Sequence, residues 1–282
     1  MSVHSRYRAG LWHPYEKPMY GVLLNPYHPL SRGLVAAWLF NEGGGNTVFD
    51  LSGYGNHGTL GGGTAAYCPV WTTGKLGSAL SFDDDYVKVL DADILDITDR
   101  ITLEVWMIPD VAQSGDIVAQ PAGKYCYQLN YDHETPDFQG SFAIKSGSTW
   151  YNSDGPLSIS NGVLHQFVGT YDGTHLKTFL DGIEKLSNNI GSVTIKIGTC
   201  PFLIGANPET EDSSTPVNFF NGTILLCRLW ERALRPSEIW QLYTDPFCMF
   251  YHPLEAELLY AAAPPAGIVP QAMHHYRMLR EV

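Results

Sequence analysis

The stretch from Gly33 to Leu60 constrains the fold most, because it alternates apolar runs with glycine-rich loops. The run from Leu34 to Phe40 leads into Gly43-Gly44-Gly45, and the segment DLSGYGNHG precedes a second short apolar run. Glycine tolerates positive φ and close backbone approach, which tight turns between strands require. The pattern therefore predicts short β-strands joined by tight turns.

Composition favours one large β-sandwich with appendages. The chain has 282 residues, of which 44% are hydrophobic and 12% aromatic, with 16 Tyr and 7 Trp. Aromatic side chains are enriched in sheets, and all-β domains of this size occur as single units. Charged residues make up only 16%, which argues against disorder in the central region.

The charge is unevenly distributed along the chain. Residues 33–246 hold 11 Lys and Arg against 25 Asp and Glu, whereas residues 1–32 hold four basic residues and only Glu16. An acidic body repels phosphates, so nucleic acid is not an expected partner. A basic arm beside an acidic body predicts docking on a neighbouring copy.

The five cysteines and the N-terminus point to a reducing compartment. The number of cysteines is odd and no C-x-x-C pair occurs, so we interpret them as buried free thiols. The start, Met1 to Arg8, lacks the apolar segment of a signal peptide, and no apolar run of about 18 residues suggests a membrane span. We expect no membrane partner.

Both ends of the sequence predict extended arms. Residues 1–32 and 247–282 mix prolines with aromatic and aliphatic residues. Proline excludes regular helix and central strand, while the apolar content predicts contact with a surface. We expect these arms to make intersubunit contacts through Trp12, Tyr15, Tyr20, Leu23, Leu24, Phe247, Phe250 and Tyr251.

Between the arms, residues 33–246 read as one domain of short strands followed by a helix at 236–243. Five aromatic residues in its apolar strands are expected to be buried, namely Trp38, Phe82, Trp106, Phe179 and Trp230. The strands are expected at 34–40, 79–82, 86–89, 101–108, 116–119, 125–131, 141–145, 149–152, 164–171, 175–180, 202–204 and 222–230.

Five segments in order resemble the laminin-G-like, concanavalin A-like jelly-roll family. They are GLVAAWLFNEGGG with DLSGYGNHG, GSALSFDDDYVKV, ITLEVWMIP, GTYDGTHLKTFLDGIEK, and FNGTILLCRLWERALRPSEIWQLY. The Asp-Gly pairs at 172–173 and 181–182 favour hairpin turns. The resemblance covers residues 33–246 and implies an all-β, two-sheet antiparallel sandwich with one short C-terminal helix. The arms lie outside it.

The resemblance also raises the question of a structural calcium ion. In many relatives an acidic residue of the last strand helps to hold the ion, but Leu225 stands at that position here. Leucine offers no side-chain oxygen, whereas calcium takes 6–8 oxygen ligands. Asp50 and Asn56 are the remaining candidate ligands, and we expect no cofactor to be required.

Catalytic patterns are missing from the sequence. Glycosidases of this fold carry closely spaced acids on one strand, but Glu104 stands alone in Leu103-Glu-Val-Trp106 and is expected to face outward. No serine or cysteine lies in a nucleophile motif. We therefore expect a protein that is not an enzyme.

One loop suits carbohydrate. Trp150, Tyr151 and Asp154 combine aromatic rings, which stack on sugars, with a group that bonds hydroxyls. Packing or a protein interface explains the two rings as well.

Two classes of function follow. The closing stretch Leu242 to Phe250 resembles laminin-G-like proteins of bacteriophage genomes. This resemblance implies a virion surface protein that is assembled in the host cytoplasm. Such a protein would form a homo-oligomer and contact other structural proteins of the virion. The alternative is a carbohydrate-binding lectin module. The expected lack of a signal peptide and the two arms favour the first class.

Overall fold

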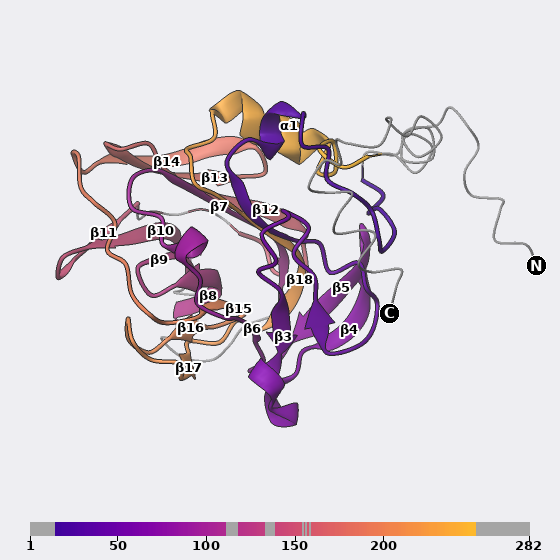
Figure 1. Cartoon of the computed structure of the whole chain (residues 1–282). Coiled ribbons are helices and arrows are strands. Elements are labelled where there is room, and N and C mark those ends of the chain that lie inside the picture. Colours follow the sequence, from indigo (N-terminus) through magenta and orange to yellow (C-terminus); the bar gives the residue numbers. More distant parts are fainter. Residues whose placement is uncertain are drawn as a thin grey trace, which may run out of the picture.

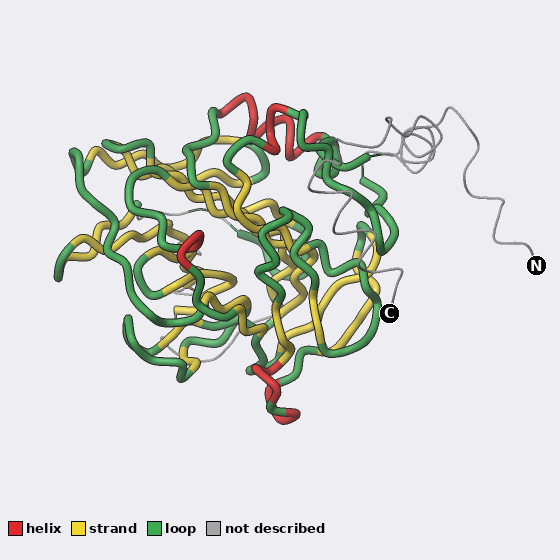
Figure 2. Tube along the Cα trace, viewed as in Figure 1, coloured by secondary structure: helices red, strands yellow, loops and turns green. Residues whose placement is uncertain are grey.

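The computed structural model describes residues 15–110, 118–132, 139–153, 155, 157 and 159–251, without the side chains of 118–122, 132 and 139. Strands dominate, and they form two large antiparallel sheets that pack face to face (Figure 1). Figure 2 shows how little of the chain is helical. The all-β sandwich with one short helix is confirmed. Among the described residues, no helix is long and apolar enough to cross a membrane.

The first sheet has eight strands. Across the sheet they are β14 (Ile183–Asn189), β13 (His175–Leu180), β12 (His165–Tyr171), β7 (Ile101–Pro109), β18 (Gly222–Trp230), β5 (Gly77–Phe82) and β4 (Val70–Gly74), with β1 (Leu34–Trp38) also paired to β18. Neighbours in this order come from distant parts of the chain, so the sheet ties both halves of the sequence together.

The second sheet also has eight strands. Their order is β11 (Thr149–Asn152), β10 (Gln139–Ser146), β9 (Tyr127–Asp132), β8 (Val118–Lys124), β15 (Phe202–Ile204), β6 (Val87–Val89), β3 (Gly58–Leu60) and β2 (Thr47–Val48). A small hairpin of β16 (Asn207–Pro208) and β17 (Pro216–Val217) lies against β8 and β15.

Within the described residues, helical structure is limited to α1 (Pro236–Thr244) and short 3-10 turns. The helix has proline in its first turn and a reciprocal cap, in which Glu238 accepts from the backbone N–H of Arg235 at 2.8 Å. The 3-10 turns are η2 (Pro29–Ser31), η3 (Gly61–Gly63), η4 (Ala65–Tyr67) and η5 (Asp93–Leu95).

Strand positions follow the sequence prediction closely in the apolar runs. The two Asp-Gly pairs lie at hairpin turns as predicted, and Asp181 and Gly182 both have positive φ, at 52° and 78°. Six strands lie outside the expected ranges: the short β2, β3, β16 and β17, and the longer β4 and β14. The two longer ones are edge strands with mostly exposed side chains, so they lack the apolar signature of the others.

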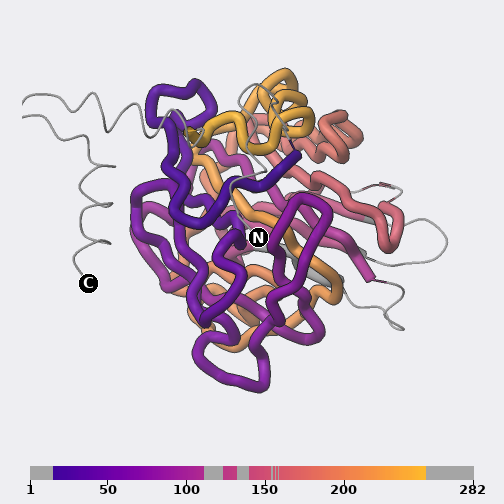
Figure 3. Tube along the Cα trace, turned by 90° about the vertical axis from the view of Figure 1, so that its right-hand side faces the viewer, coloured from indigo at the N-terminus to yellow at the C-terminus, as the bar shows by residue number. Residues whose placement is uncertain are grey.

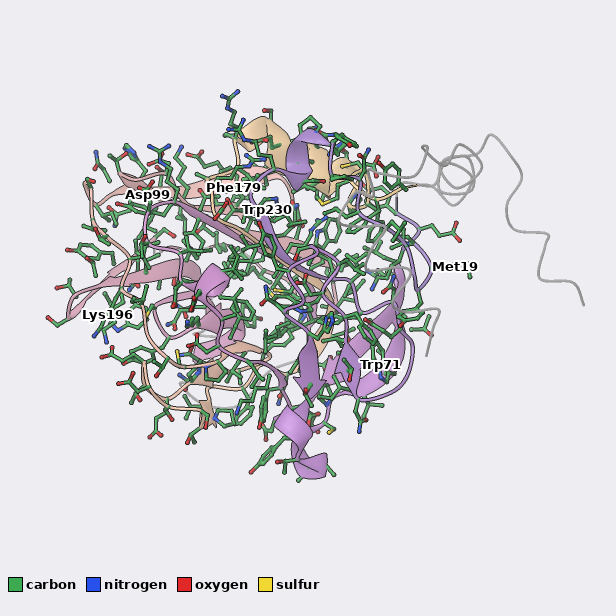
Figure 4. All side chains as sticks on the ribbon, viewed as in Figure 1. Met19, Trp71, Asp99, Phe179, Lys196 and Trp230 are labelled. Carbon is green, nitrogen blue, oxygen red and sulfur yellow. The ribbon has the colours of Figure 1, made fainter. Side chains whose placement is uncertain are left out.

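The main core lies between the two sheets and includes Trp38 and Phe82. The prediction of five buried aromatic residues is confirmed, since none is more than 2% exposed. However, Trp106, Phe179 and Trp230 belong to a second core on the outer face of the first sheet. The helix α1 covers that face, as Figure 1 shows, and Figure 4 places Phe179 and Trp230 beneath it.

Because the first sheet is covered on both faces, its central strands are buried along almost their whole length. Glu104 on β7 is on the outer face, as predicted, but it is fully buried rather than in solvent. Its carboxylate binds Arg228 of β18 through Nε at 2.8 Å and Nη2 at 2.9 Å. Gln166 and Trp106 donate to it as well.

The described parts of both terminal segments pack on the body of the same chain. Phe247 and Phe250 are buried in the second core of the same chain, so they do not form an exposed interface strip. Leu24 forms a β-bridge with Phe250, and Leu23 accepts from the backbone of Tyr251 at 2.9 Å. Leu23, Leu24 and Tyr251 are half-buried. The packed body therefore extends beyond residues 33–246 at both ends.

Two predicted interface residues remain on the surface. Tyr15 and Tyr20 are 45% and 55% exposed. They belong to the N-terminal strap, residues 15–25, which appears as the indigo segment against the body in Figure 3. Trp12 lies outside the described residues. Intersubunit contact through Tyr15 and Tyr20 stays a prediction.

Candidate functional site

The candidate calcium ligands Asp50 and Asn56 do come together, but the carboxylate of Asp50 is already occupied. Oδ1 accepts from the N–H groups of Ala37 and Ser52, both at 2.9 Å, and Oδ2 accepts from Asn56 N at 3.0 Å and Ser52 Oγ at 2.7 Å. Four donors hold this carboxylate as the centre of a turn. This hydrogen bonding gives Asp50 a structural role, and its service as a calcium ligand stays a prediction.

Asn56 has a similar structural role. Its Nδ2 donates to Val35 O at 3.0 Å, and its backbone oxygen accepts from the indole N–H of Trp38 at 2.7 Å. Within the part of the chain that the structure describes, no group of three or more His, Cys, Asp or Glu side chains could hold a metal ion.

The proposed sugar-stacking pair does not share one face. Trp150 lies opposite Lys145 in the ladder of β10 and β11, while Tyr151 lies opposite Ile144 and packs against the main core. Successive strand residues point to opposite faces, so both rings cannot contact one sugar. Tyr151 is thus corrected to a core residue, and Asp154 lies outside the described residues. Trp150 alone remains on the outer face.

Trp150 belongs to a polar surface that the sequence interpretation missed. On β9, Tyr127, Leu129 and Tyr131 face the main core, which places Gln128 and Asn130 on the outer face. The same alternation places the intervening residues of β10 there. We define the amide face as the outward residues of β9, β10 and β11: Gln128, Asn130, Ser141, Ala143, Lys145, Trp150 and Asn152.

The amide face contains two buried oxygen atoms that lack a hydrogen-bond donor. Gln128 is only 8% exposed, and its Oε1 has no partner. Asn130 donates through Nδ2 to Ser141 Oγ at 3.1 Å, but its Oδ1 also has no partner. Buried polar atoms are almost always satisfied in folded proteins, so two orphans on one face point to a missing donor. Both oxygens are acceptors of the kind that water or a ligand hydroxyl satisfies.

One end of the amide face is aromatic and charged. Tyr125, in the turn between β8 and β9, packs edge-on against Trp150 with ring centroids 5.4 Å apart. The ammonium of Lys145 lies 4.4 Å from the Tyr125 centroid and 5.7 Å from that of Trp150. All three side chains are half-buried.

A carboxylate from another part of the chain reaches this end. Glu211, between β16 and β17, binds Lys145 through Oε2 at 3.0 Å and Lys196 through Oε1 at 2.6 Å. Hydrogen bonds from Lys196 and Lys145 lower the pKa of Glu211, so it stays ionised. Lys196 is labelled on the left of Figure 4, well away from Met19 of the N-terminal strap on the right.

A sequence signal for the amides does exist. The stretch Tyr127-Gln-Leu-Asn-Tyr131 alternates large apolar residues with amides, which predicts one buried and one polar face. Tyr125, Lys196 and Glu211 give no such signal, because only long-range pairing brings them beside Trp150.

Three solved structures show what the sandwich resembles. Domain 4 of AbnA, an arabinanase from Geobacillus stearothermophilus in complex with arabinotriose, has a TM-score of 0.57 and 21% identity over 74% of this chain and 98% of that one. The botulinum neurotoxin serotype D binding domain with N-acetylneuraminic acid gives 0.55 and 11%, over 77% and 52%. A Trypanosoma rangeli sialidase gives 0.52 and 16%, over 77% and 33%.

These likenesses are of fold alone. This chain spans about half the length of the matched toxin binding domains and a third of the sialidase chain. No curated protein matches the sequence.

A family model gives the assignment. The Laminin_G_3 model, described as the concanavalin A-like lectin/glucanases superfamily, matches residues 81–240. That range contains the whole amide face, β7, β18 and part of α1. It covers more than half of the sequence, and the observed sandwich agrees with it. The chain therefore belongs to the Laminin_G_3 family of the concanavalin A-like lectin/glucanases superfamily.

Proposed function

We propose that this protein binds carbohydrate on the amide face. The observation that carries the proposal is the pair of donorless oxygens, Gln128 Oε1 and Asn130 Oδ1, on one outer surface. Sugar hydroxyls are donors that can satisfy such oxygens, and an amide held by the sheet needs little reorganisation to accept them.

The neighbouring side chains suit the same ligand class. Trp150 and Tyr125 offer aromatic surface at one end, and aromatic rings with a few placed polar groups are typical of ligand sites. Two structural neighbours, the arabinanase domain and the toxin domain, were solved with sugars, which supports this class of ligand.

The proposal is tested on a glycan array that contains neutral and acidic oligosaccharides, including arabinotriose. Wild-type protein should bind at least one glycan. Trp150→Ala should weaken that binding by about tenfold, since a sugar–ring contact of this kind contributes on the order of 1.4 kcal/mol. The matched control is Trp240→Ala, because Trp240 is an exposed tryptophan on α1.

If Trp150→Ala and Trp240→Ala lose glycan binding equally, the glycan binds elsewhere or both variants are misfolded. Binding to no glycan at all would contradict the proposal.

We further propose that binding occurs without turnover. Glycoside hydrolysis needs two carboxyl groups on either side of the bond. The residues that define the amide face include no carboxylate, Glu211 beside them is paired with Lys145 and Lys196, and Glu104 is fully buried in its pairing with Arg228. The check is release of reducing sugar from the array-positive glycan. The proposal would be contradicted if purified protein released reducing sugar and an acid-to-amide substitution abolished that release.

A second candidate function is assembly into the surface of a virus particle, in the host cytoplasm, through contacts between copies of this chain and other structural proteins. What supports it is a set of exposed apolar side chains on and near the N-terminal strap, namely Tyr15, Met19, Tyr20 and Tyr27. Scattered apolar residues are normal on surfaces, whereas a group on one segment is typical of an interface.

Native mass measurement tests assembly. Tyr20→Ser with Tyr27→Ser should reduce a wild-type oligomer to monomer, while Tyr54→Ser, which changes an exposed tyrosine elsewhere, should not. A wild-type protein that stays monomeric at high concentration would contradict this second function.

A further inference from the structure

The charged side chains at the end of the amide face, Lys145, Lys196 and Glu211, resemble a binding site that already holds a carboxylate. Two ammonium groups, from Lys145 and Lys196, each bind one oxygen of the Glu211 carboxylate, at 3.0 and 2.6 Å. Aromatic rings of Tyr125 and Trp150 adjoin the first lysine. A planar carboxylate is thus held at both oxygens, beside rings that offer a surface for stacking.

The three charged groups come from three separate elements. Lys145 is on β10, Lys196 is in the connection between β14 and β15, and Glu211 is in the loop between β16 and β17. The backbone of Lys196 donates to Lys145 O at 2.7 Å, which fixes the two lysines relative to each other without help from Glu211. The main chains of the two lysines are therefore joined by a backbone hydrogen bond, while the carboxylate is brought to them by a different loop.

The Glu211 loop is anchored through its main chain. Cys200 N donates to Glu211 O at 2.9 Å, and a Cβ added at Gly198 would lie 2.6 Å from that oxygen. The side chain of Glu211 extends from this anchor and is 27% exposed, so it is open to solvent at the lysines. A side chain that is partly exposed can rotate away while its backbone stays in place.

The charge balance leaves the cluster receptive to an anion. Two lysines share one carboxylate, and Lys145 is only 12% exposed. When the Glu211 carboxylate moves out, a second carboxylate can take both hydrogen bonds, and the exchange conserves the number of charge-assisted bonds. The net charge of −12 repels anions at long range, but salt screens that repulsion beyond about 8 Å.

We propose that Lys145 and Lys196 recognise the carboxylate of an acidic sugar, and that Glu211 occupies their site as a built-in competitor. This inference rests on the proposed carbohydrate binding and names its ligand class. The sugar ring would stack at Trp150, and its hydroxyls would point along the amide face toward Gln128. Glu211 sets a threshold, because only a sugar that presents a carboxylate in this position displaces it.

The test uses two ligands that differ only in the carboxylate, methyl β-D-glucuronide and methyl β-D-glucoside, titrated into the full chain by NMR. Glu211→Gln removes the competing charge. It should tighten glucuronide binding about tenfold and leave glucoside binding unchanged, since one charge-assisted pair is worth on the order of 1.4 kcal/mol. Adding Lys145→Met to this variant should abolish the gain. The matched control is Glu184→Gln, which removes a carboxylate paired to Lys177 at 3.1 Å on the first sheet.

Four results would overturn the inference: no gain for the glucuronide in Glu211→Gln, an equal gain for the glucoside, a gain in Glu184→Gln, or a gain that survives Lys145→Met. If Glu211→Gln does not fold, the wild-type protein is labelled with ¹⁵N at lysine. Glucuronide should then shift the side-chain signals of Lys145 and Lys196 at concentrations where glucoside shifts neither, and equal shifts would reject the inference. Tight binding of neutral glycans on the array, with no glucuronide effect, leaves the proposed function intact and removes this inference alone.

Discussion

The buried ion pair of Glu104 and Arg228 shows how a single residue is misjudged from sequence. Glu104 lies on an outward-facing position of β7, the face that period-2 alternation predicts. It is nevertheless excluded from solvent, because α1 and the segment at 246–250 cover it. Arg228 binds that segment directly through Nη1 to Pro246 O at 2.6 Å. The cover comes from over a hundred residues away, so local pattern does not reveal it.

Breaking this pair from one side should be costly. Glu104→Gln leaves the buried guanidinium of Arg228 without its countercharge, and the expected loss is about 3–5 kcal/mol in the free energy of unfolding. Urea unfolding measures it. The control is Glu184→Gln, whose partly exposed pair with Lys177 should contribute about 1 kcal/mol or less. Equal losses at both sites would contradict the account of a buried pair.

At the scale of elements, α1 follows directly from its sequence. Pro236 and the cap by Glu238 start the helix, and Ile239 and Leu242 form the buried side that covers the second core. The predicted helix and the observed one differ by one residue. Edge strands behave differently, since β14 is exposed at nearly all positions and carries no apolar repeat.

Cover by α1 should dominate the stability of the second core. Ile239→Ala should cost about 2–5 kcal/mol, because a fully buried aliphatic side chain leaves a cavity. Its neighbour Trp240 is 49% exposed, so Trp240→Ala should cost much less. Thermal and urea unfolding provide the comparison, and a larger loss at Trp240 would mean that the helix packs by a different side.

The N-terminal strap is joined to the body by a buried lysine. The Nζ of Lys17 donates to Ser78 O, and to Leu225 O at 2.6 Å, at a point where the register of β18 is shifted. Burial lowers the pKa of Lys17 to about 7, against a partly opposing effect of Glu42. Burial likewise raises the pKa of Glu42.

The sign of the resulting pH dependence follows from proton counting. Between pH 7 and about 10 the unfolded chain keeps the Lys17 proton while the folded chain loses it, so the free energy of unfolding should rise with pH. The slope from this residue is at most about 1.4 kcal/mol per pH unit. Urea unfolding at pH 7.5 and 9 should show this rise in the wild-type protein and not in Lys17→Met. Parallel pH profiles for the two proteins would contradict it.

At the scale of the molecule, the sequence predicted the sandwich because its apolar strands and glycine turns are local signals. The candidate site was predicted only in part. Trp150 was named as a candidate and lies on the proposed face, whereas Tyr151 lies on the opposite one, because adjacent strand residues point to opposite faces. The charged end of the amide face was missed, because three distant segments build it. The described arms turned out to be parts of the body, since Phe247 and Phe250 complete its second core.

The central claim is that carbohydrate binds on the amide face, and side-chain amide NMR tests it most directly. The glycan with the strongest array signal is titrated into ¹⁵N-labelled wild-type protein and into Gln128→Leu. The account predicts that the side-chain amide signals of Gln128 and Asn130 shift first. It also predicts that Gln128→Leu weakens binding about tenfold without loss of stability, because Oε1 has no partner in the free protein. Unchanged binding in Gln128→Leu, with shifts confined to other surfaces, would contradict the claim.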